Sequence, residues 1–249
     1  MTAKSRVGAT SPQLVPPDVL ERLNLGLDQT VNLSETLAMD SEVLWANVFP
    51  EIPVPPGFNA AKVNPKLALA GAALAASPRL DALVDHLSDM VRGWACAGMV
   101  HRAVDLPAAI ADLEPLANDH HFGVREWAWL ALRPLVVAEP IRAVGILTEW
   151  SFRPEENLRR FASEATRPRG VGCAHISELK AEPWLGLPLL EPMKSDPSRY
   201  VQNSVANWLN DAAKSQPEWV RSVCARWSEE CPARETAYIV KRAMRSLGD

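Results

Sequence analysis

Long apolar runs are missing from this chain of 249 residues, and so is a secretory leader. No stretch stays apolar for the length that a bilayer-spanning helix needs. The first residues also do not combine a charged segment with an apolar one. These absences argue against a membrane protein. We therefore expect a cytoplasmic protein that has no membrane partner.

Cysteine and histidine are sparse as well, with four and five residues. Cys224 and Cys231 stand seven positions apart with no histidine near them, which is not the spacing of metal ligands. The cysteines are therefore expected to be reduced thiols. Ser163 and Cys173 have no histidine at a position that would activate them as nucleophiles. The sequence therefore predicts no nucleophilic catalysis, no metal site and no other cofactor.

Charge is spread unevenly along the chain. The formal net charge is −4, but residues 1–149 carry 11 basic against 17 acidic side chains, whereas residues 150–249 carry 15 against 13. A polyanion would therefore meet the C-terminal part. Nine tryptophans accompany only two tyrosines, and indoles serve both in cores and on stacking surfaces.

Helical patterns account for most of the chain, and no stretch is convincing as a strand. Residues 1–16 are polar and stop before a proline pair, which predicts a flexible leader. Residues 17–77 are expected to form N-terminal helices around an extended, proline-rich linker at 50–56. Together with the helical patterns of the C-terminal part, they predict one helical domain over 17–249.

A repeat becomes visible from about Pro78. Each copy has a first helical pattern, a short polar turn and a second helix. The apolar anchors of the second helices lie 33, 34 and 43 residues apart, at Val91, Val124, Leu158 and Val201. Stacked helix pairs at such a period are typical of HEAT-like repeats. The predicted fold is all-α, a HEAT-like α-solenoid of antiparallel helix pairs with a concave groove, and its repeats cover 78–249.

The segment 156–170 combines an apolar helical face with an unusual number of charges. Its four arginines surround one interior carboxylate, Glu164. The second helices of a solenoid lie side by side, so matching positions of successive repeats become neighbours. This stacking brings Glu164 and Asp211 toward one groove.

A groove lined by arginines and a pair of carboxylates suits an extended anion, and duplex DNA is the obvious candidate. The basic residues expected to contact it are Arg125, Arg159, Arg160, Arg167, Arg169 and Lys214. Trp127, Trp129 and Trp208 lie on or near the same helices and are candidates for stacking on a base or contacting a sugar. Core packing is the alternative for these indoles, as a structural ion pair is for Glu164.

Three stretches carry more specific motifs. Residues 159–169 read Arg-Arg-Phe-Ala-Ser-Glu-Ala-Thr-Arg-Pro-Arg, and residues 236–243 read Thr-Ala-Tyr-Ile-Val-Lys-Arg-Ala. Residues 196–211 read Asp-Pro-Ser-Arg-Tyr-Val-Gln-Asn-Ser-Val-Ala-Asn-Trp-Leu-Asn-Asp. Over roughly residues 120–249 the chain thereby resembles the bacterial alkylpurine DNA glycosylases of the AlkC/AlkD type, and most closely the AlkC branch.

The resemblance implies a HEAT-like protein that holds damaged duplex DNA and removes cationic N3- or N7-alkylated purines. It also implies that Glu164 and Asp211 are the catalytic carboxylates. A base that is already a cation leaves as a neutral molecule, so no general acid is needed. A carboxylate close to the sugar would stabilise the oxocarbenium-like transition state and orient a water molecule, and Glu164 is the first choice for this role and Asp211 the second. Flanking arginines should keep both carboxylates ionised.

The chain departs from the family pattern at two places. The family's arginine-rich run leads into an active-site tryptophan, whereas this chain continues with Gly-Val-Gly-Cys at 170–173. His121 stands where the family has an acidic residue. The missing indole would open space, so an adduct larger than a methyl group is one hypothesis.

Three functions stay open from the sequence. The first is an alkylpurine DNA glycosylase, expected to act as a monomer on duplex DNA. The second is a HEAT-like DNA-binding protein without catalysis. The third is a protein-binding solenoid, in which the acidic N-terminal half recognises a peptide. Steep loss of DNA binding with salt would separate the first two from the third, and release of methylated purines would separate the first from the second.

Overall fold

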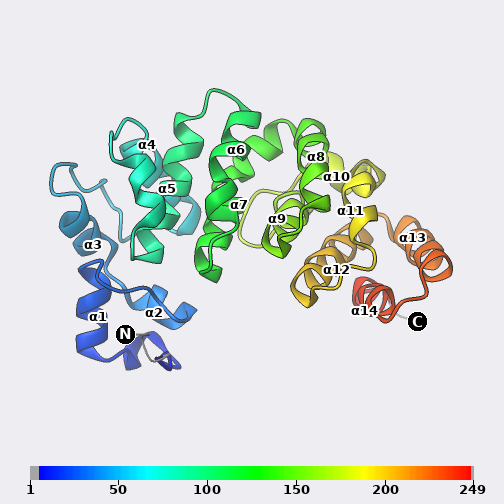
Figure 1. Ribbon diagram of the computed structural model, residues 1–249, viewed down its shortest axis with the longest axis horizontal. Coiled ribbons are helices and arrows are strands. Elements are labelled where there is room, and N and C mark those ends of the chain that lie inside the picture. Colours follow the sequence, from blue (N-terminus) through cyan, green and yellow to red (C-terminus); the bar gives the residue numbers. More distant parts are fainter. Residues whose placement is uncertain (1–5, 248–249) are drawn as a thin grey trace. The chain divides into compact units, whose positions relative to one another are not determined.

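The computed structural model describes residues 6–247, and within this range it contains helices and no strand (Figure 1). The expected all-α class is confirmed. The chain divides into two compact units, one of Met1–Arg102 with His121–Ala131 and one of Ala103–His120 with Leu132–Asp249. The division falls inside one long helix, α7 (Phe122–Ala138). No helix of residues 6–247 is both long and apolar enough to cross a membrane.

Unit 1 holds the N-terminal helices. In chain order its elements are η1 (Pro12–Leu14), α1 (Pro17–Asn24), α2 (Leu33–Ala38), α3 (Ser41–Val48), α4 (Val63–Leu74), η2 (Leu80–Asp85), α5 (Asp89–Arg102) and the start of α7. Asn32 and Asp40 cap α2 and α3, because their side chains accept hydrogen bonds from backbone N–H groups of the first turn. The proline-rich linker separates α3 from α4, as expected, and α4 packs along α5.

The described part of the expected leader contacts the start of α2. Arg6 forms an ion pair with Glu35, which is buried at the start of α2. The side-chain amide of Asn32 also donates to the carbonyl of Ala9 at 2.9 Å. A buried carboxylate needs a charged partner, and the segment supplies one. The first five residues of the expected leader lie outside the described residues.

Unit 2 contains the remaining repeats. Its elements are α6 (Leu106–Ala117), the end of α7, α8 (Pro140–Thr148), η3 (Glu149–Phe152), α9 (Glu156–Ala165), α10 (Ser177–Ala181), η4 (Pro183–Gly186), α11 (Leu187–Leu190), η5 (Glu191–Met193), α12 (Arg199–Ala213), α13 (Pro217–Glu230) and α14 (Arg234–Ala243). The second helices α9 and α12 pack side by side, and α12 also packs along α14 (Figure 1). This stacking is the arrangement that the repeat predicts. The repeat pattern does not predict α13, which packs on both α12 and α14.

Candidate active site

The helix α9 is buried on its charged side as well as on its apolar side. Leu158 and Phe161 fill the core, but Arg160 and Glu164 are also less than a tenth exposed. The charged side is covered because α12 packs along it and contributes Ser204 to the neighbourhood of Glu164. The dense charges of this segment are therefore not a solvated helix face.

Both carboxylate oxygens of Glu164 have donors inside the protein. Nη1 of Arg167 lies 2.6 Å from Oε1, and Oγ of Ser204 donates to Oε2 at 2.6 Å. Nη2 of Arg160 is 3.8 Å from Oε2. The hydroxyl of Ser163 donates in turn to Oγ of Ser204 at 2.5 Å. The carboxylate of Glu164 is thus held by two helices, α9 and α12.

Glu164 is ionised although it is buried. Burial by itself opposes ionisation, but the charges of Arg160 and Arg167 and the hydrogen bonds from Ser204 and Arg167 outweigh it. Together they hold the pKa of Glu164 below its ordinary value of 4.5. The site therefore carries a negative charge at neutral pH, as the sequence predicts.

Arg167 connects Glu164 to Asp211. Nε and Nη2 of Arg167 donate to Oδ2 of Asp211 at 2.9 and 2.7 Å, while its Nη1 serves Glu164. Burial alone would lower the pKa of Arg167, but the charges of the two carboxylates have the larger effect and raise it above its ordinary value. The guanidinium therefore stays protonated. The other oxygen of Asp211, Oδ1, lies 3.2 Å from Nζ of Lys214, an exposed side chain. The expected neighbourhood of Glu164 and Asp211 is thereby observed.

Arg133 on α7 belongs to the same cluster, and its position in the sequence does not single it out. Its guanidinium is fully buried and donates to three backbone carbonyls around the end of α9, those of Ala165 at 2.7 Å, Arg167 at 2.7 Å and Ala174 at 3.0 Å. Burial is the main cause of its lowered pKa. The recurrence of Arg-Pro at 133–134 and 167–168 is the signal in the sequence that could have pointed to it.

The turn after Arg169 replaces the family's tryptophan. A side chain at Gly170 would place its Cβ 2.6 Å from Sγ of Cys173 and 3.5 Å from the guanidinium carbon of Arg133. The turn is thus tightly packed at Gly170, whereas a Cβ at Gly172 would have nothing within 4 Å. The larger adduct stays a prediction. Burial raises the pKa of the Cys173 thiol despite the nearby arginines, so this cysteine is protonated.

The remaining basic residues of the expected DNA surface in unit 2 have partners of their own. Arg159 donates to both oxygens of Asp196, at 2.6 and 3.1 Å. The guanidinium of Arg160 lies over the ring of Tyr200, 4.6 Å from its centroid. Arg169 donates to Oγ of Ser215 at 2.7 Å. Among the basic residues that the sequence predicted for the DNA surface of unit 2, those within 4.0 Å of Glu164 or Asp211 are Arg160, Arg167 and Lys214.

The expected indoles pack into the protein. Trp208 is fully buried, and its Nε1 donates to the carbonyl of Thr166 at 3.1 Å. In unit 1, Trp129 is 2% exposed and donates to Glu126, while Trp127 packs against Gly93, where an added Cβ would meet the indole at 2.5 Å. A buried indole cannot stack on a base without leaving the core. Core packing, the alternative considered from the sequence, therefore holds for Trp129 and Trp208.

Arg125 and His121 also belong to unit 1. Arg125 is half-buried near the start of α7. Nε2 of His121 donates to the carbonyl of Thr30 at 2.6 Å, and its Nδ1 accepts from the backbone N–H of Gly123. His121, which replaces an acidic residue of the family pattern, therefore links α7 to the segment before α2.

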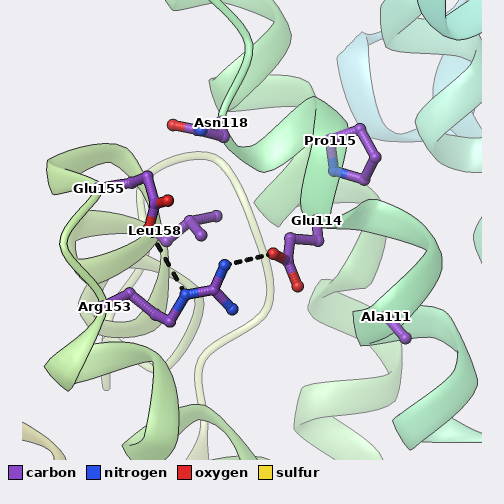
Figure 2. A pocket seen from close by; sticks show the side chains of 7 residues that line it. All are labelled: Ala111, Glu114, Pro115, Asn118, Arg153, Glu155 and Leu158. Carbon is purple, nitrogen blue, oxygen red and sulfur yellow. Dashed lines mark hydrogen bonds and ion pairs between the residues drawn. The ribbon is translucent and has the colours of Figure 1, made fainter.

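A cavity of about 380 Å³ lies in unit 2 at the start of α9. Arg153 crosses it and pairs with Glu114 at 2.6 Å and with Glu155 at 3.5 Å (Figure 2). The lining residues are Ala111, Glu114, Pro115, Asn118, Arg153, Glu155 and Leu158. Glu164 and Asp211 do not line this cavity, so it is separate from the carboxylate pair.

Comparisons with known proteins agree with the fold and with the motifs. The chain is 27% identical to Pseudomonas fluorescens alkylpurine DNA glycosylase AlkC, whose structure bound to DNA containing an abasic site analog aligns with a TM-score of 0.60 over 81% of this chain and 59% of that one. It is 39% identical to the uncharacterized protein YhaZ of Bacillus subtilis (strain 168) over 117 residues, which are 47% of this chain and 32% of YhaZ. No protein-family model matches. The chain thus spans less than two thirds of both relatives, and the AlkC neighbour supports the all-α solenoid.

Proposed function

We propose that this protein is a DNA glycosylase that hydrolyses the N-glycosidic bond of cationic N3- or N7-alkylated purines in duplex DNA. The observation that carries the proposal is the bridge that Arg167 forms between the buried carboxylates of Glu164 and Asp211. The similarity to an alkylpurine DNA glycosylase supports the substrate class. The HEAT-like repeat, the monomeric state and the cytoplasmic location remain predictions from the sequence.

The reaction needs a negatively charged group beside the deoxyribose, and it does not need a general acid that protonates the leaving purine. An alkylated purine leaves as a neutral molecule, and positive charge develops on the deoxyribose. A fixed carboxylate stabilises that charge, and it costs no reorganisation because Arg167 already holds it in place. The same carboxylate can orient the attacking water molecule.

The two carboxylates differ in how their oxygens are occupied. Both oxygens of Glu164 receive hydrogen bonds from buried side chains. Among the described residues, Oδ1 of Asp211 has a hydrogen bond from the exposed Lys214 alone. An oxygen at the exposed side can face a sugar once Lys214 moves. We therefore assign the contact with the deoxyribose to Asp211 first, and assign to Glu164 the positioning of Arg167. This order reverses the preference for Glu164 that the motif alone suggested.

The test is release of methylated purines from duplex DNA treated with a methylating agent, measured by chromatography of the freed bases. Asp211→Asn and Glu164→Gln should each lower the rate by at least about tenfold, the low end for losing a charge-stabilising group. Asp211→Asn should lower it more. Glu218→Gln, on the exposed surface of α13, is the matched control and should leave the rate unchanged.

The second candidate is a DNA-binding protein without catalysis. It is favoured by the complete hydrogen bonding of Glu164, which is also what a purely structural ion pair would show. Wild-type protein that binds duplex DNA but frees no base would establish this candidate and reject the glycosylase.

A further inference from the structure

The arginines of unit 2 differ in how their charges are neutralised. Many lie within 4.0 Å of a carboxylate, including Arg159 and Arg226. Among the described residues no carboxylate lies that close to Arg199, Arg242 or Arg245. These three arginines come from α12 and from the end of α14, two helices that pack along each other. Arg133 and Arg169 also have no carboxylate within 4.0 Å among the described residues, but they donate to backbone carbonyls and to Ser215. Three of the arginines without an ion pair are thus gathered on two adjacent helices.

Tyr238 on α14 holds two of these arginines together. The guanidinium carbon of Arg199 lies 3.5 Å from the centroid of its ring, and that of Arg242 lies 5.6 Å away. The ring is fixed in turn, because its hydroxyl donates to Oδ1 of Asn203 at 2.8 Å. A guanidinium on an aromatic face keeps its N–H donors for a ligand. The stack therefore orders two like charges without neutralising them.

Arg245 joins the group from just beyond the end of α14. Its Nη2 donates to Oδ1 of Asn207 at 3.0 Å, and its Nη1 donates to the carbonyl of Arg242 at 2.6 Å. Partial burial and the charge of Arg242 lower its pKa. Nε of Arg242 is buried and has no hydrogen-bond partner. Arg242 and Arg245 are thus held close together by a direct hydrogen bond.

Two carboxylates stand near this group, Asp211, which already pairs with Arg167, and Glu235. Glu235 accepts a hydrogen bond from Arg234, and this bond lowers its pKa, with a smaller contribution from the charge of Arg199. It is already paired with Arg234 at 2.6 Å, so it does not neutralise the three arginines.

The group and Asp211 share the helix α12, with Arg199 in its first turn and Asp211 in its last. Arg199, Asn203, Asn207 and Asp211 follow at steps of four residues, and each step turns about 40° around the axis, so the row winds along the helix. At about 1.5 Å per residue the row is ~18 Å long. Asn203 and Asn207, which hold Tyr238 and Arg245, thus connect the group with the end of α12 that carries Asp211.

We propose that Arg199, Arg242 and Arg245 form a surface that binds the phosphates of duplex DNA beside Asp211. The choice of DNA as partner rests on the proposed function. Arginine forks match phosphate oxygens, and contacts of this kind position a protein on DNA without reading its sequence. The sequence alone favoured Arg159 and Arg167 for phosphate binding, whose charges the structure instead pairs with carboxylates.

The test measures binding of the full chain to undamaged duplex DNA by fluorescence anisotropy at several salt concentrations. Each phosphate contact contributes about 0.9 to the slope of log affinity against log salt, so the double variant R242A/R245A should have a slope shallower by about 2. The control is R221A/R226A on α13, which removes the same charge from arginines that already pair with carboxylates. Its slope should match that of the wild type. Circular dichroism checks that both variants are folded.

The outcomes separate this surface from the proposed enzyme activity. Equal slopes for the wild type and R242A/R245A would overturn the surface, even if methylated purines are released. Tighter binding of the wild type to poly-glutamate than to duplex DNA would also overturn it, in favour of an acidic protein partner. The expected loss of slope in a protein that frees no base would uphold the surface and reject the glycosylase.

Discussion

Glu164 and Asp211 are two buried carboxylates that share one guanidinium. Removing the partner of a buried charge costs about 3–5 kcal/mol of stability. Arg167 therefore stabilises the fold at this site and also favours the ionised form of Glu164. Arg160 and Lys214 supply further positive charge at 3.8 and 3.2 Å. These side chains surround the two carboxylates with positive charge.

The lowered pKa of Glu164 makes stability depend on pH. The ionised form is favoured in the folded protein, so its contribution is complete above about pH 4.5, the ordinary value, and is lost as pH falls through the lowered pKa. The difference in unfolding free energy between the wild type and Glu164→Gln should therefore shrink as pH is lowered from about 5 toward about 3. Urea unfolding at several pH values measures it. A difference that stays constant over this range would contradict the ion-pair network.

At the scale of elements, the end of α9 is stabilised by a side chain from another helix. A helix end leaves carbonyls without partners inside the helix, and a cation there is favourable. Arg133 of α7 binds the carbonyl of Ala165 and, beyond it, those of Arg167 and Ala174. The backbone that carries Arg167 is thereby fixed by α7, so α7 contributes to the site without touching either carboxylate.

Replacing Arg133 should therefore destabilise the protein strongly. Arg133→Met keeps most of the apolar stem but removes the donors of three carbonyls, and each buried group left unsatisfied costs about 1–3 kcal/mol. We expect a loss of roughly 3 kcal/mol or more in the free energy of unfolding, measured with urea. Arg142→Ala, which removes an exposed ion pair, should lower the free energy of unfolding much less. Equal losses for the two variants would show that the carbonyl contacts do not matter.

At the scale of the whole molecule, the net charge of −4 hides an uneven distribution. The basic side chains exceed the acidic ones only in residues 150–249, and there many arginines are paired with carboxylates. Affinity for a polyanion is set by the charges that remain unpaired and exposed rather than by the total. An acidic protein can therefore bind DNA through a small surface.

The wild-type protein should bind undamaged duplex DNA with an affinity that falls steeply with salt. Release of counterions from several phosphate contacts lowers affinity about 10³-fold or more between 50 and 200 mM salt when six or more contacts form, and proportionally less for fewer. About three to four contacts should still give a loss of roughly tenfold or more. Anisotropy titrations at both salt concentrations measure it. Binding that does not change with salt would favour a protein-binding scaffold.

The sequence by itself determined most of the helices, the stacking of the second helices of successive repeats and the neighbourhood of Glu164 and Asp211, but not α13. These features depend on periodicity and on equal positions in successive repeats, which are local properties of the chain. Polar capping residues and proline positions are local in the same sense, and they place the helix starts at Asn32 and Asp40.

Only the tertiary structure decided which charges are neutralised and which indoles are buried. Arg159 finds Asp196 at a separation of 37 residues, and Arg133 reaches carbonyls up to 41 residues away. Trp208 is buried in the core because Gly186, which has no side chain, leaves room for the indole ring. Such pairings depend on which helices pack against each other and on the paths of long side chains, and residue spacing does not encode either. For this reason the arginine-rich run at 159–169 located the carboxylates, while the arginines proposed to bind phosphate lie on α12 and at the end of α14.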